Sequence, residues 1–198
     1  MSSVRSQLRS QLRESVKVAI LEAAEDLIAA NGLAGAPLAQ IAKKAGVAVG
    51  TLYNYFEDRD ALIRGLFEMR RATLHPELRA AVKKGAALPF EQRLRSFVRD
   101  VLGVFEAHRK YVKVALETEH LKLSHPSTTK TDLTNAIAEL VKAGIKEKLI
   151  AAEYGEVLPV VLQGAVKAVL MYRLGENAPI TDADADKLVS ILLDGARR

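Results

Sequence analysis

The apolar residues of this chain recur every three to four positions over long stretches, which is the period of amphipathic α-helices. In residues 38–62, Leu38, Ile41, Ala42 and Ala45 share one helical face, and Gly46 follows where the chain must turn. Together with Leu52, Ala42 and Gly46 have the spacing of a helix-turn-helix. The pattern predicts two short helices, in an arrangement shared by DNA-binding heads and by ordinary αα-hairpins.

The same period predicts helices along the rest of the chain. A helix over about 12–30 follows a polar, loose arm at 1–10. A helix from residue 59 is expected to kink or restart at Pro76, with a second piece over 77–84. Further helices are predicted over 90–108, 109–124, 131–150, 153–174 and 182–196. We therefore expect an all-α fold, with a three-helix head over 10–58 and a larger helical body over 59–198.

Composition and charge exclude few classes of protein. The chain has 198 residues, of which 49% are hydrophobic and none is Cys, so disulfides and thiolate metal sites are excluded. The first residues lack the apolar core of a secretory signal. The apolar run Val157 to Tyr172 is broken by Gln163 and Lys167 and is short for a membrane span. We expect a soluble, cytoplasmic protein.

A row of arginines precedes the apolar face of the first helix. Arg5, Arg9 and Arg13 continue the face that carries Val16 and Ile20, so an apolar stripe becomes cationic toward the N-terminus. The net charge of +5 is compatible with a polyanionic partner such as DNA. A solvated charge run is the alternative.

Nothing in the sequence favours an enzyme or a metal site. No pair of histidines has the i, i+4 spacing of a zinc-binding helix, and no glycine-rich loop is suited to cradle phosphate. We expect neither a metal nor another cofactor, and no catalytic residue.

The residues that fill the helix-turn-helix frame resemble a known family. The segment Gly50-Thr51-Leu52-Tyr53-Asn54-Tyr55-Phe56, the Asp58-Arg59 pair and Leu62, preceded by Ile41-Ala42-x-x-Ala45-Gly46-Val47, resemble the signature of the TetR (tetracycline-repressor) family. The match covers the first third of the chain. It implies a homodimeric repressor that binds a palindromic operator in double-stranded DNA and is released by a small molecule.

The resemblance and the chemistry of the side chains give a candidate DNA-contacting set. Val49 can meet a thymine methyl, Asn54 can read adenine, and Tyr53 matches a phosphate-contacting position of the family. Leu52 and Phe56 are expected in the core, which is also the alternative for Tyr53. Pro37, Ala39 and Ala48 depart from the family's polar residues. The set is Arg13, Gln40, Val49, Gly50, Thr51, Tyr53, Asn54, Tyr55 and Arg59.

The resemblance also implies an effector pocket and a dimer interface in the body. The predicted pocket, for an apolar or amphipathic effector, is lined by Phe67, Phe97, Val101, Phe105, Tyr111, Leu116, His120 and Tyr172, although such residues often form core. The predicted interface is Val161, Gly164, Ala168, Leu188, Ile191 and Leu192, although both helices can pack within one subunit.

Two other functions compete with ligand-controlled repression. A transcriptional activator would have the same head, and a helical protein-interaction module would use it for protein contacts. A small helical enzyme is a third alternative, but it needs convergent titratable groups that the sequence does not show.

Overall fold

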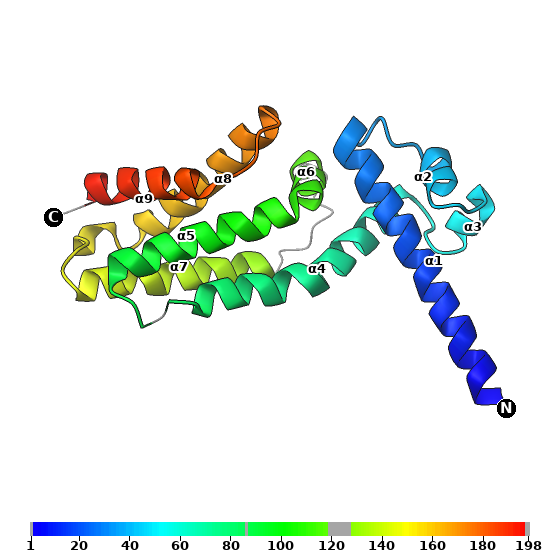
Figure 1. The fold of residues 1–198 in the computed structure, drawn as a ribbon, viewed down its shortest axis with the longest axis horizontal. Helices are drawn as coiled ribbons and strands as arrows, with labels where there is room; N and C mark the ends of the chain where they lie inside the picture. The colour runs from blue at the N-terminus through cyan, green and yellow to red at the C-terminus, as the bar shows by residue number, and fades with distance from the viewer. Residues whose placement is uncertain (1, 86, 119–127, 197–198) are drawn as a thin grey trace. The chain divides into compact units, whose positions relative to one another are not determined.

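A computed structural model describes residues 2–85, 87–118 and 128–196, and within these ranges the fold is all-α, as predicted. Figure 1 shows the order of the helices along the chain. They are α1 (Ser2–Asn31), α2 (Leu38–Lys44), α3 (Val49–Tyr53), α4 (Arg59–Lys83), α5 (Phe90–Ala107), α6 (Arg109–Glu117), α7 (Thr128–Lys146), α8 (Val157–Gly175) and α9 (Asp182–Ala196), with a 3₁₀ turn at Ala152–Tyr154.

The chain forms two compact units. The described residues of Met1–Ala72 and Lys110–His125 form the first, and those of Thr73–Arg109 and Pro126–Arg198 form the second. By packing, α6 and the first half of α4 therefore belong to the same unit as the helix-turn-helix. The functional division expected at residues 58 and 59 remains a prediction.

The first unit is held together by the apolar face of α1, against which α2 packs, and α3 packs on α2 and adds Leu52 to the same core (Figure 1). Gly46, with φ of +72°, makes the turn between α2 and α3 in a conformation that is costly for other residues. The amide of Val47 then donates to the carbonyl of Ala42 at 3.0 Å. The core of this unit contains Ile20, Leu21, Ala24, Ile41, Ala42, Leu52 and Phe56.

Two predictions about helix boundaries are wrong. Residues 2–10 belong to α1 and are not a loose arm, since the helix begins at Ser2. Of the two effects expected of Pro76, a kink or a restart, the restart does not occur, because α4 runs through the proline to Lys83. Pro76 is exposed, while Leu74 and Leu78 on either side are buried, so the apolar face of α4 continues past the proline.

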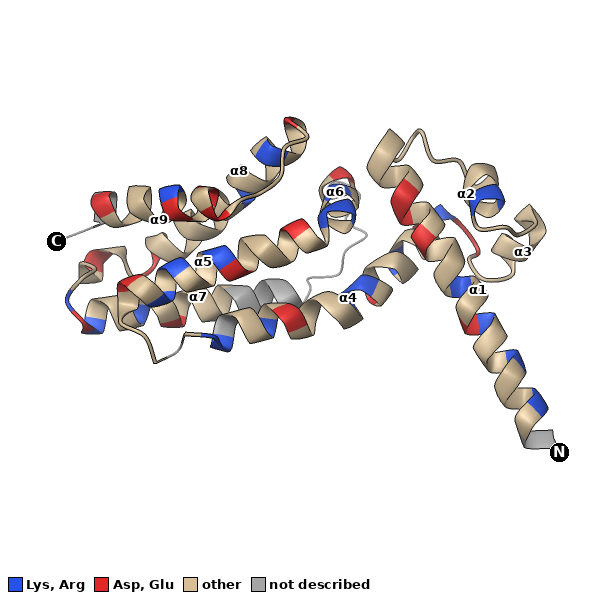
Figure 2. Ribbon diagram, viewed as in Figure 1, with Lys and Arg blue, Asp and Glu red and all other residues tan. Residues whose placement is uncertain are grey.

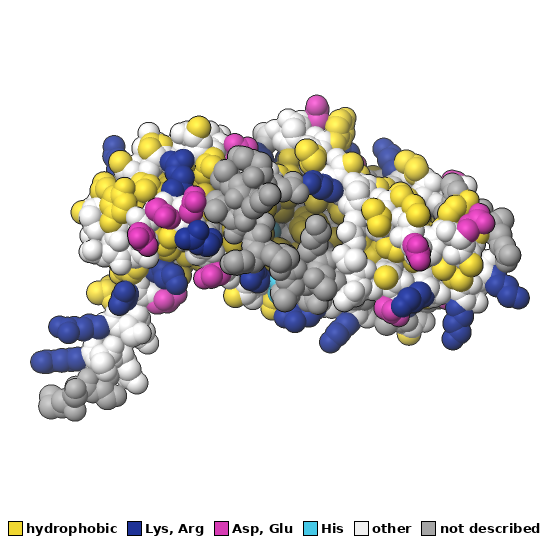
Figure 3. All heavy atoms as spheres, turned by 180° about the vertical axis from the view of Figure 1, so that it is seen from behind, with side chains coloured by type: hydrophobic (Ala, Val, Ile, Leu, Met, Phe, Trp, Pro, Cys, Tyr) yellow, Lys and Arg dark blue, Asp and Glu magenta, His cyan; other side chains and the backbone are white. Residues whose placement is uncertain are grey.

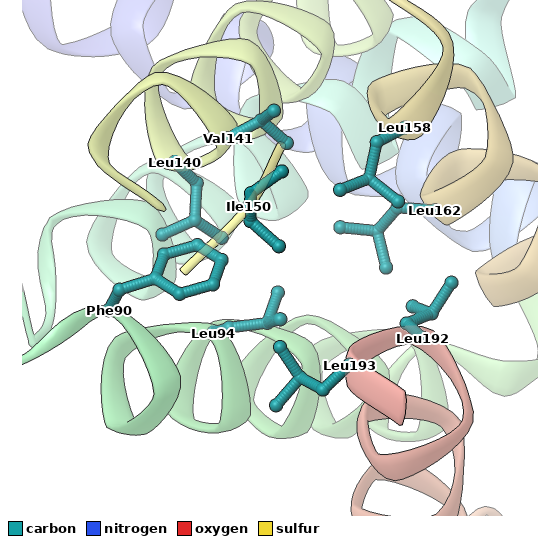
Figure 4. Close-up of a pocket in the computed structure, with 9 residues that line it drawn as sticks. All are labelled: Phe90, Leu94, Leu140, Val141, Ile150, Leu158, Leu162, Leu192 and Leu193. Carbon is teal, nitrogen blue, oxygen red and sulfur yellow. The ribbon is translucent and has the colours of Figure 1, made fainter. Parts of the chain in front are cut away.

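The second unit is a bundle in which α5 packs against α7, α8 and α9. Figure 4 shows the apolar junction at one point of this bundle, around a cavity of only about 10 Å³. Its lining comes from all four helices and the segment after α7: Phe90, Leu94, Leu140, Val141, Ile150, Leu158, Leu162, Leu192 and Leu193. A void of this size is about one water sphere, so this junction is packed core.

Polar groups fix the start of α9. The amide of Thr181 donates to Asp184 at 2.8 Å, as in a capping box, and Arg173 of α8 also pairs with Asp184. Burial opposes ionisation of Asp184, but hydrogen bonds from Arg173 and Thr181 outweigh it and lower the pKa of this carboxyl. The last two helices are thereby joined.

One helix among the described residues, α8, is long and apolar enough to cross a membrane by length and composition. The expectation that this apolar run is short for a span is therefore wrong, since the helix extends to Gly175. Only 22% of the apolar stretch is buried, so α8 has an uncovered face.

We expect Leu52→Ala to lower the free energy of unfolding of the first unit by about 2–5 kcal/mol, because a fully buried leucine leaves a cavity. Val49→Ala, at an exposed position of the same helix, is the control and should change stability by less than about 0.5 kcal/mol. Urea denaturation measures both. Equal stability of the two variants would contradict the packing described here.

Candidate nucleic-acid interface

Helix α3 presents one face to solvent and buries the other. Val49, Gly50 and Tyr53 are exposed, whereas Leu52 is fully buried. A β-carbon added to Gly50 would meet no atom within 4 Å, so the backbone there is open to close approach by a ligand. Successive helical residues are 100° apart, so burying Leu52 directs Gly50 to the opposite side of the helix and Tyr53 to its flank, while Val49, about 60° from Leu52, lies at the edge of the exposed face. The burial of Phe56 and Leu52 confirms their predicted place in the core.

The remaining candidate positions surround this face within the first unit. Gln40 on α2 and Asn54 at the end of α3 are exposed, and Thr51 is half-buried. Tyr55 packs partly against the core, and the guanidinium of Arg13 lies 5.8 Å from the centre of its ring. Arg13 of α1 is thereby brought to the helix-turn-helix.

Arg59 makes contacts that the sequence did not predict. Its two terminal nitrogens donate to the carbonyl oxygens of Leu33 and Ala36, at 2.9 Å and 2.8 Å. These carbonyls belong to the loop before α2, so Arg59 holds that loop in place. These bonds use two of the five guanidinium donors, and the DNA contact assigned to Arg59 remains a prediction.

The carboxylates of α1 bind several of the basic residues in the first unit. Asp26 accepts from Lys110 at 2.7 Å and pairs with Lys44 at 3.2 Å, and the hydrogen bond from Lys110 is the main cause of its lowered pKa. Buried Glu25 pairs with Arg70 of α4. Lys44, at the end of α2, is therefore partly neutralised. Figure 2 shows these acidic residues on the part of α1 beside α2, and basic residues toward its N-terminus.

A cavity of about 230 Å³ lies in the second unit, between α5, α7 and α8. In the lining, the side-chain amide of Gln163 donates to the hydroxyl of Thr134 at 2.9 Å. This cavity exceeds the apolar cavity of about 150 Å³ that holds a benzene molecule. The lining residues are Phe97, Val101, Phe105, Ile137, Gln163, Val166, Lys167 and Leu170.

The structure brings together three of the eight predicted pocket residues, Phe97, Val101 and Phe105. Phe67, Tyr111 and Leu116 belong to the first unit, where the rings of Phe67 and Tyr111 meet edge to face at 5.7 Å.

Burial raises the pKa of the Tyr111 hydroxyl. Tyr172 is 64% exposed and is not part of the lining, and His120 lies outside the described residues. The prediction missed the lining residues 163, 166, 167 and 170 of α8, although their spacing places them on one helical face.

The predicted dimer residues divide into two groups. Val161, Gly164 and Ala168 of α8 and Ile191 of α9 are exposed. Leu188 is buried, and Leu192 lines the small cavity of Figure 4, so both face their own subunit. These two assignments are corrected: the apolar stripe of α9 is used for packing on α5.

Val161, Gly164 and Ala168 belong to a longer apolar stripe of exposed residues on α8, which also includes Val157, Val160, Met171 and Tyr172. A β-carbon added to Gly164 would meet no atom within 4 Å, so another helix can approach closely there. Within the described residues, no group of three metal-ligating His, Asp or Glu side chains occurs.

Comparison with known proteins extends the similarity beyond the helix-turn-helix to most of the chain. Residues 20–66 match the family model of bacterial regulatory proteins of the tetR family. The HTH-type transcriptional repressor KstR2 of Rhodococcus jostii (strain RHA1) is 26% identical over 183 residues, which is 89% of this chain and 88% of that protein. The fatty acid metabolism regulator protein of Bacillus subtilis (strain 168) is 34% identical over 67 residues, 34% of each chain.

Solved structures share the fold. A TetR-like transcriptional regulator from Rhodococcus sp. RHA1 has a TM-score of 0.73 and 24% identity, over 91% of this chain and 94% of that one. The regulator FadR from Bacillus subtilis, in complex with stearoyl-CoA, has a TM-score of 0.69 and 18% identity, over 91% of this chain and 99% of that one.

We expect Arg59→Gln to lower the free energy of unfolding by about 1–3 kcal/mol, because it removes charged hydrogen bonds to two loop carbonyls. Arg64→Gln, at an exposed position one turn along α4, is the matched control and should have little effect. Chemical denaturation compares them. If Arg59→Gln unfolds like the control, the side chain does not hold the loop.

Proposed function

Because the chain belongs to the TetR family of bacterial regulatory proteins, we propose that it represses transcription by binding an operator and leaves the operator when a small molecule binds. The observation that carries this proposal is the exposed face of α3, on which Tyr53 and Val49 reach solvent while Leu52 is buried in the core. A second helix fixed in this way by a glycine turn is suited to enter the major groove. The protein would act without catalysis or cofactor, in the cytoplasm.

The phosphate backbone supplies most of the expected affinity. Tyr53, Thr51 and Arg13 are the side chains at this face suited to phosphate, while Val49 and Asn54 are suited to base edges. No arginine or glutamine of α3 provides a bidentate base contact, since its sequence is Val-Gly-Thr-Leu-Tyr. Sequence selectivity therefore depends on few base contacts and on pairing two heads.

The apolar stripe on α8 supports a homodimer. Val160 and Ile191 are 68% and 71% exposed, and contiguous apolar surface of this kind marks protein interfaces in soluble proteins. Gly164 and Ala168 at its centre would let the same helix of a second copy come close. Two copies related by a two-fold axis would match a palindromic operator in double-stranded DNA.

The 230 Å³ cavity supports an effector with a long apolar part. Its walls are phenylalanine and aliphatic side chains, with Gln163 and Lys167 as polar groups. The structural relative FadR was solved with stearoyl-CoA, and another, from Mycobacterium tuberculosis, is described as a ketosteroid transcriptional regulator. Both descriptions fit an apolar or amphipathic effector, and we propose the same class here.

We expect the affinity for random duplex DNA to fall by about 10³–10⁵ between 50 and 200 mM salt, as for proteins with 6–10 phosphate contacts. Tyr53→Phe should weaken binding by roughly 2- to 12-fold, the value of one hydrogen bond, with unchanged stability. Tyr154→Phe, at an exposed position of the second unit, is the control. Fluorescence anisotropy measures these affinities. Salt-independent binding, or none, would favour the protein-interaction module.

We expect straight-chain acyl-CoAs to raise the melting temperature of the protein. They should also release bound duplex, because an effector that lowers the affinity for DNA has its own affinity lowered by DNA by the same factor. Val166→Phe should abolish the thermal shift by filling the cavity, whereas Leu149→Phe, at an exposed position, should retain it. Differential scanning fluorimetry measures the shift. Stabilisation by polar metabolites alone would refute an apolar effector.

A further inference from the structure

The first four turns of α1 project from the first unit as a solvent-exposed, cationic helix. Every residue from 4 to 15 is exposed. Arg5, Arg9, Arg13 and Lys17 recur every fourth residue and form one row, and Glu14 is the only acidic residue between positions 2 and 17. Figure 3 shows basic side chains extending from this projecting segment. We call residues 4–17 the basic arm.

The basic row begins at the candidate DNA-binding face. Arg13 lies over the ring of Tyr55, two residues beyond the end of α3, and Arg9 and Arg5 follow along α1 at steps of about one helical turn. Four residues of helix rise about 6 Å, so Arg5 lies about 12 Å along the axis from Arg13. The row therefore leads away from the helix-turn-helix on the same rigid helix.

The protein itself does not neutralise this row. Among the described residues, Arg5 and Arg9 have no ion pair or hydrogen bond through their side chains. The first turn of α1 contains no acidic residue, so the positive end of the helix dipole adds to the charge of Arg5. Positive charge without internal compensation is suited to a polyanion.

We propose that the basic arm is a second DNA-contacting element, in which Arg5 and Arg9 bind phosphates that flank the site contacted by α3. This inference rests on the proposed operator binding. The exposed side chains of Val4, Leu8 and Leu12 form a neighbouring row and face the same partner. Arginine and apolar side chains occur together in proteins that contact the minor groove, so both rows are compatible with duplex DNA.

The continuity with Tyr55 decides between DNA and other partners. A basic amphipathic helix can also bind an anionic lipid surface. A lipid-binding helix, however, has no need to share its cationic row with the face of a helix-turn-helix, as Arg13 does. Duplex DNA is the one partner that the basic row and α3 can contact together.

The test compares the salt dependence of duplex binding between two variants of equal charge. Each phosphate contact contributes about 0.9 to the slope of log affinity against log salt, so Arg5→Gln with Arg9→Gln should reduce the slope by about 1.8 per bound subunit. Lys83→Gln with Lys146→Gln, at exposed positions of the second unit, is the control and should leave the slope unchanged. Both variants should melt like the wild type, because neither pair is in the core.

The outcomes separate this inference from the proposed function. If the wild type shows steep salt dependence and the arm variant has the same slope, the proposal that the basic arm contacts DNA is wrong, while the proposed operator binding stands. A wild type that does not bind duplex would overturn both. Vesicles containing phosphatidylserine are the second probe: binding that the arm variant loses, without a change in its duplex slope, would overturn the DNA assignment in favour of a lipid surface.

Discussion

The DNA-facing surface depends on the packing of Leu52 in the core of the first unit. Helix α3 has five residues and no side-chain cap, so it is too short to be stable without tertiary packing. Leu52 and the following Phe56 are buried in a core shared with α1 and α2, and this fixes the rotation of α3 about its axis. The exposure of Gly50 and Tyr53 follows from that rotation, and any function of this face depends on it.

Polar contacts join the helices and the loop that surround this core in the first unit. Arg59 binds two carbonyls of the loop before α2, and Glu25 joins α1 to Arg70 of α4. A buried ion pair adds little net stability, but the loss of one partner leaves an uncompensated charge. Asp26 in turn contacts both Lys44 of α2 and Lys110 of α6. Helix α1 thus forms ion pairs with α2, α4 and α6.

The sequence predicted the parts of the fold that depend on local periodicity. Gly46, Leu52 and Phe56 could be placed because a glycine turn and two apolar anchors have few alternative uses in such a short motif. The arm was predicted wrongly because its polar composition resembles a loop, whereas its four-residue rows continue the period of α1. The loop contacts of Arg59 could not be predicted, since a sequence shows a charge but not its partner.

Helices with two apolar faces were the other source of error. On α9 the sequence does not distinguish Leu188, which packs inside, from Ile191, which is exposed. Helix α8 has the opposite property: Gln163 and Val166 face the larger cavity, and Gly164 and Ala168 face solvent. A ligand in that cavity would therefore touch the helix that we propose as the dimer contact.

Selection of bound sequences from a random duplex library tests most directly whether two copies of the α3 face bind DNA together. Our account predicts enrichment of an inverted repeat whose half-site centres lie about 10 base pairs, or a multiple of that, apart. Enrichment of a single unrepeated site, or no enrichment above non-specific binding, would contradict it.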